Sequence, residues 1–161
     1  AFAEMLEYGY GGMTMEVKEL NTDRIEEIKE AMTAIFSVEP WNDVWNPEQL
    51  HVYFLEIIGN RNSLSFGLYE GGRLIGISLG RIKHWCEGTE YWIDEFGILP
   101  KWQGQGAGSR FLAEIEARLA ESGITGVVLL TERTVPAFFF YEKNGFKAVD
   151  EQVFFAKKIG K

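Results

Sequence analysis

The sequence is poor in the residues that build disulfides, metal sites and membrane spans. Its one cysteine, Cys86, excludes a disulfide within the chain, so a reducing, cytoplasmic compartment is expected. The two histidines, His51 and His84, lack partners at metal-ligand spacing, and no metal is predicted. No apolar run approaches the ~20 residues that a membrane-spanning helix needs, so no membrane partner is expected.

Basic residues are outnumbered by acidic ones. The chain has 16 Lys and Arg against 24 Asp and Glu, which gives a net charge of −8. Such a surface repels nucleic acid and anionic membranes and favours cationic ligands. The 161 residues, 46% of them hydrophobic, are enough for one domain with a real core. A strand pattern begins near Met13, so we expect a single domain over residues 13–161 and a leader or expression remnant over residues 1–12.

The first half of the chain mixes the two hydrophobic periodicities. Alternating apolar residues predict a strand over residues 13–20, and helical spacing follows over residues 21–36. A second helix is predicted over residues 46–59, where Asn46 is the candidate cap. Two strand patterns around a Gly-Gly turn then predict a hairpin over residues 64–82.

The second half predicts further strands and two helices. EYWIDEFGIL predicts a strand, and GVVLLT (126–131) is typical of a strand buried on both faces. A helix separates these two strands, and a short last helix follows, with Thr134 as candidate cap. A closing hairpin is predicted over residues 146–158. The predicted fold class is α/β, with a mixed sheet of six to seven strands and about four helices on both faces.

A glycine-rich segment, QGQGAG (103–108), stands where a strand gives way to a helix. A helix that opens on such a turn exposes N–H groups that bind anions, phosphate above all. A P-loop needs Lys and then Ser or Thr after its last glycine, and Ser109 and Arg110 stand there instead. The dinucleotide pattern Gly-x-Gly-x-x-Gly also fails, because its sixth position is Ser109 or Phe111.

The motif Gln103-x-x-Gly106-x-Gly108 resembles the [Arg/Gln]-x-x-Gly-x-[Gly/Ala] signature of the GNAT acyltransferases. It stands in the family's context, after a strand and a proline and before an amphipathic helix. The segment FFFYEKNGF (138–146) resembles a second signature, in the family's last helix. The resemblance covers roughly residues 13–158 and is to bacterial members of the aminoglycoside and small-amine type.

The resemblance implies acetyl-CoA as cosubstrate and a sheet that splays open to admit it. Amides of the glycine loop would hold its pyrophosphate, and its pantetheine arm would lie along a strand edge. The loop residues are Gln103, Gly104, Gln105, Gly106, Ala107, Gly108 and Ser109, and the edge residues are Phe96, Gly97 and Ile98. A backbone N–H near Ile98 would meet the oxyanion. The alternative for the loop is a helix start without a ligand. Many members carry Asn where Thr134 stands, so a cofactor contact there is in doubt.

Acetyl transfer to an amine needs a base for the ammonium and an acid for the departing thiolate. Tyr141 matches the family tyrosine that serves the thiolate, although its aromatic neighbours also fit a plain core residue. For the base, Asp94 is preferred to Glu95, and a β-bulge would exchange their faces. Either acid could instead be a solvated edge charge. Cys86 is not expected to act as a nucleophile, since no histidine lies in the motif regions.

The segment between the first two helices, residues 37–49, is expected to cover the acceptor. Trp41, Asp43 and Trp45 would give it flat apolar walls and negative charge, which suits a polyamine, an aminosugar or an aminoglycoside. The tryptophans could equally fasten the loop to the core.

The predicted function is transfer of the acetyl group of acetyl-CoA to a primary amine of a small cationic acceptor. Assembly as a homodimer is left open. The alternatives are a protein N-terminal or lysine acetyltransferase, a non-catalytic acyl-CoA-binding sensor domain and a nucleotide-binding module. A peptide substrate needs an open groove. The bulky loop with Trp41 and Trp45 favours a closed pocket for a small molecule instead. A turnover assay distinguishes an enzyme from a non-catalytic sensor domain. A comparison of acetyl-CoA binding with ATP and NAD binding distinguishes it from a nucleotide-binding module.

Overall fold

The computed structural model of the protein describes residues 14–160. The chain forms two compact units, the first ending at Leu130 and the second beginning at Thr131. The predicted leader, residues 1–12, lies outside the described residues, and a single domain over residues 13–161 stays a prediction. No helix in the described part of the chain has the length and apolar character needed to cross a membrane.

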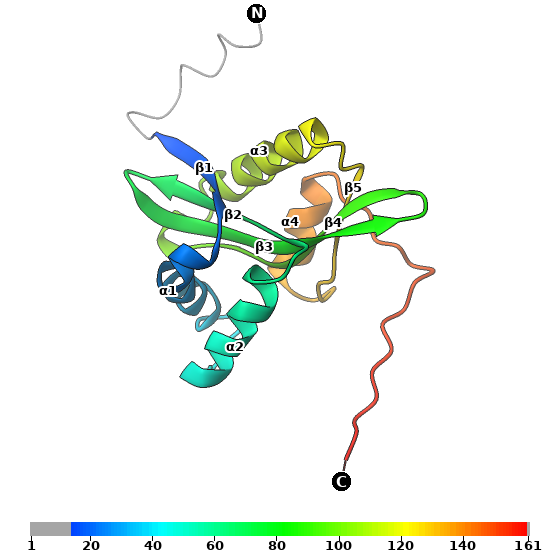
Figure 1. The fold of residues 1–161 in the computed structure, drawn as a ribbon, viewed down its shortest axis with the longest axis horizontal. Helices are drawn as coiled ribbons and strands as arrows, with labels where there is room; N and C mark the ends of the chain where they lie inside the picture. The colour runs from blue at the N-terminus through cyan, green and yellow to red at the C-terminus, as the bar shows by residue number, and fades with distance from the viewer. Residues whose placement is uncertain (1–13, 161) are drawn as a thin grey trace, which may run out of the picture. The chain divides into compact units, whose positions relative to one another are not determined.

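A five-stranded mixed sheet forms the centre of the first unit (Figure 1). The strands are β1 (Met15–Leu20), β2 (Ser63–Glu70), β3 (Arg73–Trp85), β4 (Gly88–Ile98) and β5 (Gly126–Leu129). They lie side by side in chain order, each antiparallel to the one before except β5, which is parallel to β4. The mixed α/β class is therefore confirmed, with fewer strands than the six to seven predicted.

Helices cover both faces of this sheet. They are α1 (Ile25–Phe36), α2 (Pro47–Ile58) and α3 (Ala107–Glu121), with short 3-10 helices at Thr22–Arg24 and Pro100–Trp102. Adjacent residues of β4 show the two faces. Gly97 lies so close to α1 that a Cβ there would stand 2.5 Å from Ile35, whereas Phe96 stacks on Phe111 of α3 with ring centroids 5.5 Å apart. In Figure 1, α1 and α2 accordingly lie across the sheet from α3.

The helix α2 begins and ends where the sequence predicts. The Asn46 side chain accepts hydrogen bonds from the backbone N–H groups of Glu48 at 2.9 Å and Gln49 at 3.4 Å. Pro47 occupies the first helical position, and Gly59 follows the last. This local start signal fixes the turn of helix from which Tyr53 projects toward the sheet.

A β-bulge interrupts the pairing of β3 and β4 at Asp94. Leu79 pairs with Glu95 and Gly80 pairs with Ile93, so Asp94 is the extra residue on β4. The bulge changes which residues of β4 share a face, and Asp94 and Glu95 both turn toward α2.

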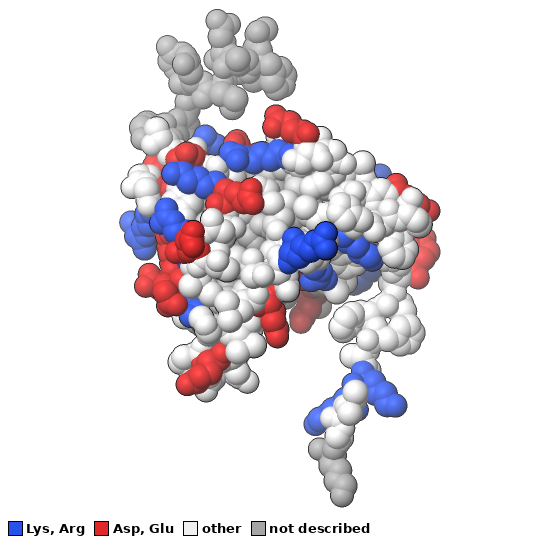
Figure 2. Space-filling model, in the orientation of Figure 1, with Lys and Arg blue, Asp and Glu red and all other residues white. Residues whose placement is uncertain are grey.

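Charges of both signs are interspersed on the face of the first unit drawn in Figure 2. Several acidic residues of the first unit have a basic neighbour within ion-pairing distance, as Glu26 has Lys29 at 2.9 Å and Glu27 has Arg24 at 3.0 Å. Part of the acidic charge is thus paired locally.

Three predictions at the C-terminal end are wrong. β5 is half-buried rather than buried on both faces, because it is a four-residue strand at the edge of the sheet. The last helix, α4 (Pro136–Lys143), has Val135 as its cap residue, one position too late for the Thr134 side chain. Residues 146–158 contain no strand. An isolated hairpin is marginal in water unless a sheet extends it, and no described strand pairs with this segment.

Candidate active site

The adjacent acids Asp94 and Glu95 of β4 have different partners on the α2 side. The Asp94 Oδ1 atom accepts a hydrogen bond from the guanidinium of Arg81, on β3, at 2.6 Å, and the two form an ion pair. The Glu95 Oε1 atom accepts a hydrogen bond from the Tyr53 hydroxyl, on α2, at 2.5 Å. Within the described residues Glu95 has no cationic partner. Glu95 is therefore the more available of the two as a proton acceptor.

The surroundings of Glu95 favour its neutral form. Burial raises the pKa of the Glu95 carboxyl above its usual value, and the negative charges of Asp43 and Asp94 act in the same direction. The hydrogen bond from Tyr53 opposes them and lowers the pKa, because it stabilises the carboxylate. A raised pKa brings a carboxylate closer to the range in which it accepts protons effectively at neutral pH.

Aromatic rings cover this pair. Trp45 stacks on the ring of Tyr53, with centroids 5.0 Å apart and planes 22° from parallel. Burial is the main cause that raises the pKa of Tyr53, so its hydroxyl keeps its proton and remains a donor. Trp41 packs edge-on against Phe36 of α1, with centroids 6.0 Å apart. Trp41 thus contacts the core through Phe36, whereas Trp45 stacks on Tyr53, the hydrogen-bond donor to Glu95.

The glycine loop, residues 103–108, leads into α3. Gly104 and Gly106 have φ of 72° and 80°, the left-handed region that glycine adopts without strain, and a Cβ on either would meet no atom within 4 Å. Among the described residues, no main-chain or side-chain acceptor bonds the N–H groups of residues 104–109. These groups stand at the positive end of the α3 dipole and suit a bound phosphate.

The edge of β4 beyond the end of β5 leads into this loop. β5 pairs with β4 only as far as Ile93, so β4 runs on from Asp94 to Ile98 past its neighbour, with no described strand on that side. The Gln103 side chain donates a hydrogen bond to the carbonyl oxygen of Ile98 at 2.8 Å, which ties the loop to the end of the strand. The predicted edge and the predicted loop are therefore continuous.

Tyr141 lies on α4, in the second unit. Its ring packs against Phe140 and Phe146, with centroids 5.3 Å and 5.4 Å away, and it is half-buried. The backbone N–H of Phe146 donates to the Tyr141 carbonyl oxygen at 3.0 Å. The role of Tyr141 beside the acids of β4 stays a prediction.

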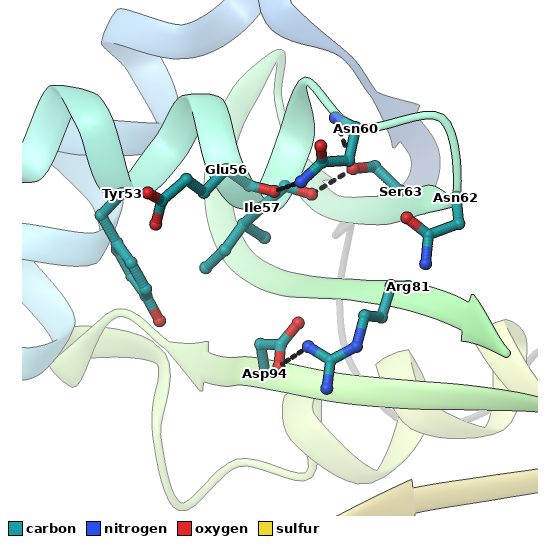
Figure 3. Close-up of a pocket in the computed structure, with 8 residues that line it drawn as sticks. All are labelled: Tyr53, Glu56, Ile57, Asn60, Asn62, Ser63, Arg81 and Asp94. Atoms are coloured by element: carbon teal, nitrogen blue, oxygen red, sulfur yellow. Dashed lines mark hydrogen bonds and ion pairs between the residues drawn. The ribbon is translucent and has the colours of Figure 1, made fainter.

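A cavity of about 240 Å³ opens beside the acids (Figure 3). One wall is formed by the C-terminal half of α2 and the chain that follows it, and its residues are Tyr53, Glu56, Ile57, Asn60, Asn62 and Ser63. The opposite wall is the ion pair of Arg81 and Asp94 on β3 and β4. Tyr53 and Asp94 therefore border both the cavity and the surroundings of Glu95.

The sequence model of the acetyltransferase (GNAT) family matches residues 25–146, about three-quarters of the chain. The chain belongs to this family. It is thus a GNAT acetyltransferase, as the two motifs predict. A search of curated proteins gave no match.

Solved structures share the GNAT fold of this chain at low sequence identity. An aminoglycoside acetyltransferase from an uncultured soil metagenomic sample, in complex with sisomicin, has a TM-score of 0.71 at 15% identity over 91% of this chain and 97% of its own. The aminoglycoside N-acetyltransferase AAC(6')-Iy, in complex with a CoA bisubstrate analogue, has a TM-score of 0.70 at 16% identity over 91% and 99%. A possible acetyltransferase from Clostridium difficile 630 has a TM-score of 0.77 at 14% identity over 91% and 99%.

Sequence reasoning missed two residues of this candidate site, Tyr53 and Arg81. Tyr53 stands in an otherwise ordinary amphipathic helix, and Arg81 stands at the polar end of a strand. Arg81 meets Asp94 only because of the strand register, which the chain order does not reveal. A signal for Tyr53 was its place about two turns after the capped start of α2, close in sequence to the tryptophan loop.

Proposed function

We propose that this GNAT protein transfers the acetyl group of acetyl-CoA to a primary amine of a small, cationic acceptor. The observation that carries the proposal is the run of unbonded amides at the start of α3, next to the strand edge that β5 leaves open. A pyrophosphate fits the amides, and an extended pantetheine chain fits along the edge of β4 beyond the end of β5, since both need only main-chain groups. Bound acetyl-CoA supplies the thioester that the amine attacks.

In this proposal residues 103–109 hold the pyrophosphate, and Phe96, Gly97 and Ile98 border the pantetheine arm. The loop glycines supply room as well as amides, because no atom stands where a Cβ of Gly104 or Gly106 would point. The side chain of Gln103 holds the loop against Ile98 rather than reaching for the ligand.

We assign the base to Glu95 rather than Asp94. An amine enters the site as an ammonium ion and must lose a proton before it attacks. Glu95 has a raised pKa and no cationic partner among the described residues, whereas the Asp94 carboxylate is paired with Arg81. Glu95 takes the proton directly or through a water, and Tyr141 serves the departing thiolate.

The acceptor meets negative charge and a flat ring. Asp43, Asp94 and Glu95 lie close enough together for their charges to act on one another or on Tyr53, and Trp45 is stacked over Tyr53. A cationic amine is stabilised by both features. Relatives in fold bind aminoglycosides, which are acceptors of this kind. We also propose a cytoplasmic location, where the exposed thiol of Cys86 stays reduced.

The direct experiment is a thiol-release assay with acetyl-CoA over a panel of amines: polyamines, aminosugars, aminoglycosides, and peptides with a free N-terminus or lysine. We expect free CoA to appear with small cationic amines and not with the peptides. Turnover with the peptides alone would overturn the acceptor class. Binding of acetyl-CoA without turnover of any amine would favour the sensor function.

A further inference from the structure

The walls of the cavity beside Asp94 and Glu95 differ in the hydrogen-bond donors and acceptors that they leave free for a ligand. Its volume, about 240 Å³, is below the ~300–1,000 Å³ of a typical complete ligand site, so it suits one end of a molecule rather than all of it. Because Tyr53 lines the cavity and also donates to Glu95, one side chain links the cavity to the proposed base.

Most hydrogen-bond donors of the α2 wall are already used. The Asn60 amide N–H donates to the carbonyl oxygen of Glu56, and the Ser63 hydroxyl donates to that of Ile57. The Asn62 amide N–H donates to the carbonyl oxygen of Ile82 at 3.2 Å. These bonds hold the end of α2 against the strands, and they leave the side-chain oxygens of Asn60 and Asn62 as acceptors without a donor among the described residues.

The opposite wall offers both donors and acceptors. One N–H of Arg81 is bonded to Asp94, which leaves further N–H groups of the guanidinium and one carboxylate oxygen to face a ligand (Figure 3). The Arg81–Asp94 pair carries no net charge, and Glu56 adds a carboxylate to the lining. The remaining N–H groups of the guanidinium need an acceptor, which an ammonium group does not have. Neutral hydroxyls, which donate and accept, match the two walls better than the ammonium ends of a polyamine.

From this balance we infer that the cavity is a subsite for the hydroxyl-bearing ring of an aminosugar whose amine is presented to Glu95. The inference rests on the proposed function and narrows it, because it selects aminosugars among the small cationic acceptors. Asn62 accepts hydrogen bonds from ring hydroxyls on one side of the cavity, and Arg81 and Asp94 bond to those hydroxyls on the other.

The test uses three acceptors that differ in what they place in the cavity: 2-amino-2-deoxyglucose, cyclohexylamine and 1,5-diaminopentane. Asn62→Leu removes an acceptor from the subsite at a position where the side chain is exposed. We expect this variant to raise KM for the aminosugar by about tenfold, the equivalent of one or two hydrogen bonds, and to leave the KM for cyclohexylamine within about twofold. Gln152→Leu, which removes an exposed amide of the second unit, is the matched control and should change neither.

A binding measurement without acetyl-CoA tests this inference independently of the proposed function. Calorimetric affinity of the aminosugar for the protein alone should fall by a similar factor in Asn62→Leu. Equal losses for all three acceptors, or unchanged aminosugar affinity in a folded variant, would overturn the subsite. A loss confined to the diamine would overturn it in favour of an ammonium site. Absence of turnover with every amine, with the binding difference intact, would overturn the proposed function alone.

Discussion

At the scale of single residues, one hydrogen bond and one ion pair distinguish two neighbouring acids. Asp94 and Glu95 are adjacent in sequence and share a face, yet Arg81 neutralises the first and Tyr53 donates to the second. Sequence reasoning named both acids and preferred Asp94. The sequence alone could not decide which acid is the base, because Arg81 on β3 and Tyr53 on α2, the partners of the two acids, are distant in the chain.

Replacing Glu95 tests the base. Glu95→Gln keeps the shape and the contact with Tyr53 but cannot accept a proton, so we expect the ascending limb of the pH–kcat/KM profile to disappear. The rate at neutral pH should fall by about 10²-fold or more. Asp94→Asn is the comparison: it should raise KM for the amine and retain the limb. If the limb vanishes in Asp94→Asn and persists in Glu95→Gln, the two roles are reversed.

Tyr53→Phe tests how the base is tuned. The substitution keeps the ring under Trp45 and removes the donor to Glu95. That hydrogen bond lowers the pKa of Glu95, so its loss should raise the pKa further and move the ascending limb to higher pH. Activity should therefore fall more at acidic pH than at alkaline pH. An equal fall at every pH would mean that Tyr53 contributes only to packing.

Tyr141→Phe tests the proposed acid. The variant keeps the ring that packs against Phe140 and Phe146 and removes the hydroxyl. We expect kcat to fall by about 10²-fold, at the low end for a positioned acid, with little change in acetyl-CoA affinity. A wild-type rate under conditions where chemistry limits turnover would identify Tyr141 as a packing residue only.

At the scale of elements, the sequence predicts those helix ends and turns that a few consecutive residues determine. The cap at Asn46, the Gly71-Gly72 turn and the start of α3 all depend on a few consecutive residues, and the structure has each of them. The predicted closing hairpin is absent because a strand depends on pairing with other strands, which the local sequence pattern does not encode. The loop and the strand edge were predicted from motifs, whereas the cavity depends on the approach of α2 to β3 and β4.

The glycine loop offers a prediction with a matched control. Gly106 and Gly72 share a φ of 80° and open surroundings, so a valine costs similar backbone strain at either. Gly106→Val should remove measurable acetyl-CoA binding, because its side chain enters the space in front of the amides. Gly72→Val, in the β2–β3 turn, should lower thermal stability comparably and leave the affinity unchanged. Calorimetry on both folded variants compares them, and equal affinities would contradict the loop assignment.

At the scale of the whole molecule, charge should influence how the acceptor arrives. A net charge of −8 attracts cations, and salt screens exposed charges over about 10 Å at 0.1 M. We expect KM for a cationic acceptor to rise with ionic strength while kcat changes little. Steady-state kinetics between low and moderate salt measure this. A flat KM would show that the interspersed charges on the surface cancel before they steer the amine.

Because Asp94 is an extra residue in β4, the number of residues in this strand helps to identify its site residues, as their types do. Deleting this extra residue would restore one-to-one pairing without moving the residues beyond it: Glu95 would still lie opposite Leu79 on the side of Tyr53, and Phe96 would still lie on the side of Phe111. Counting residues along this strand is therefore part of recognising the site. Distant relatives compared with this chain need to be aligned with a one-residue gap allowed at this position. An acid that seems displaced by one place in such a relative can occupy the position of Glu95.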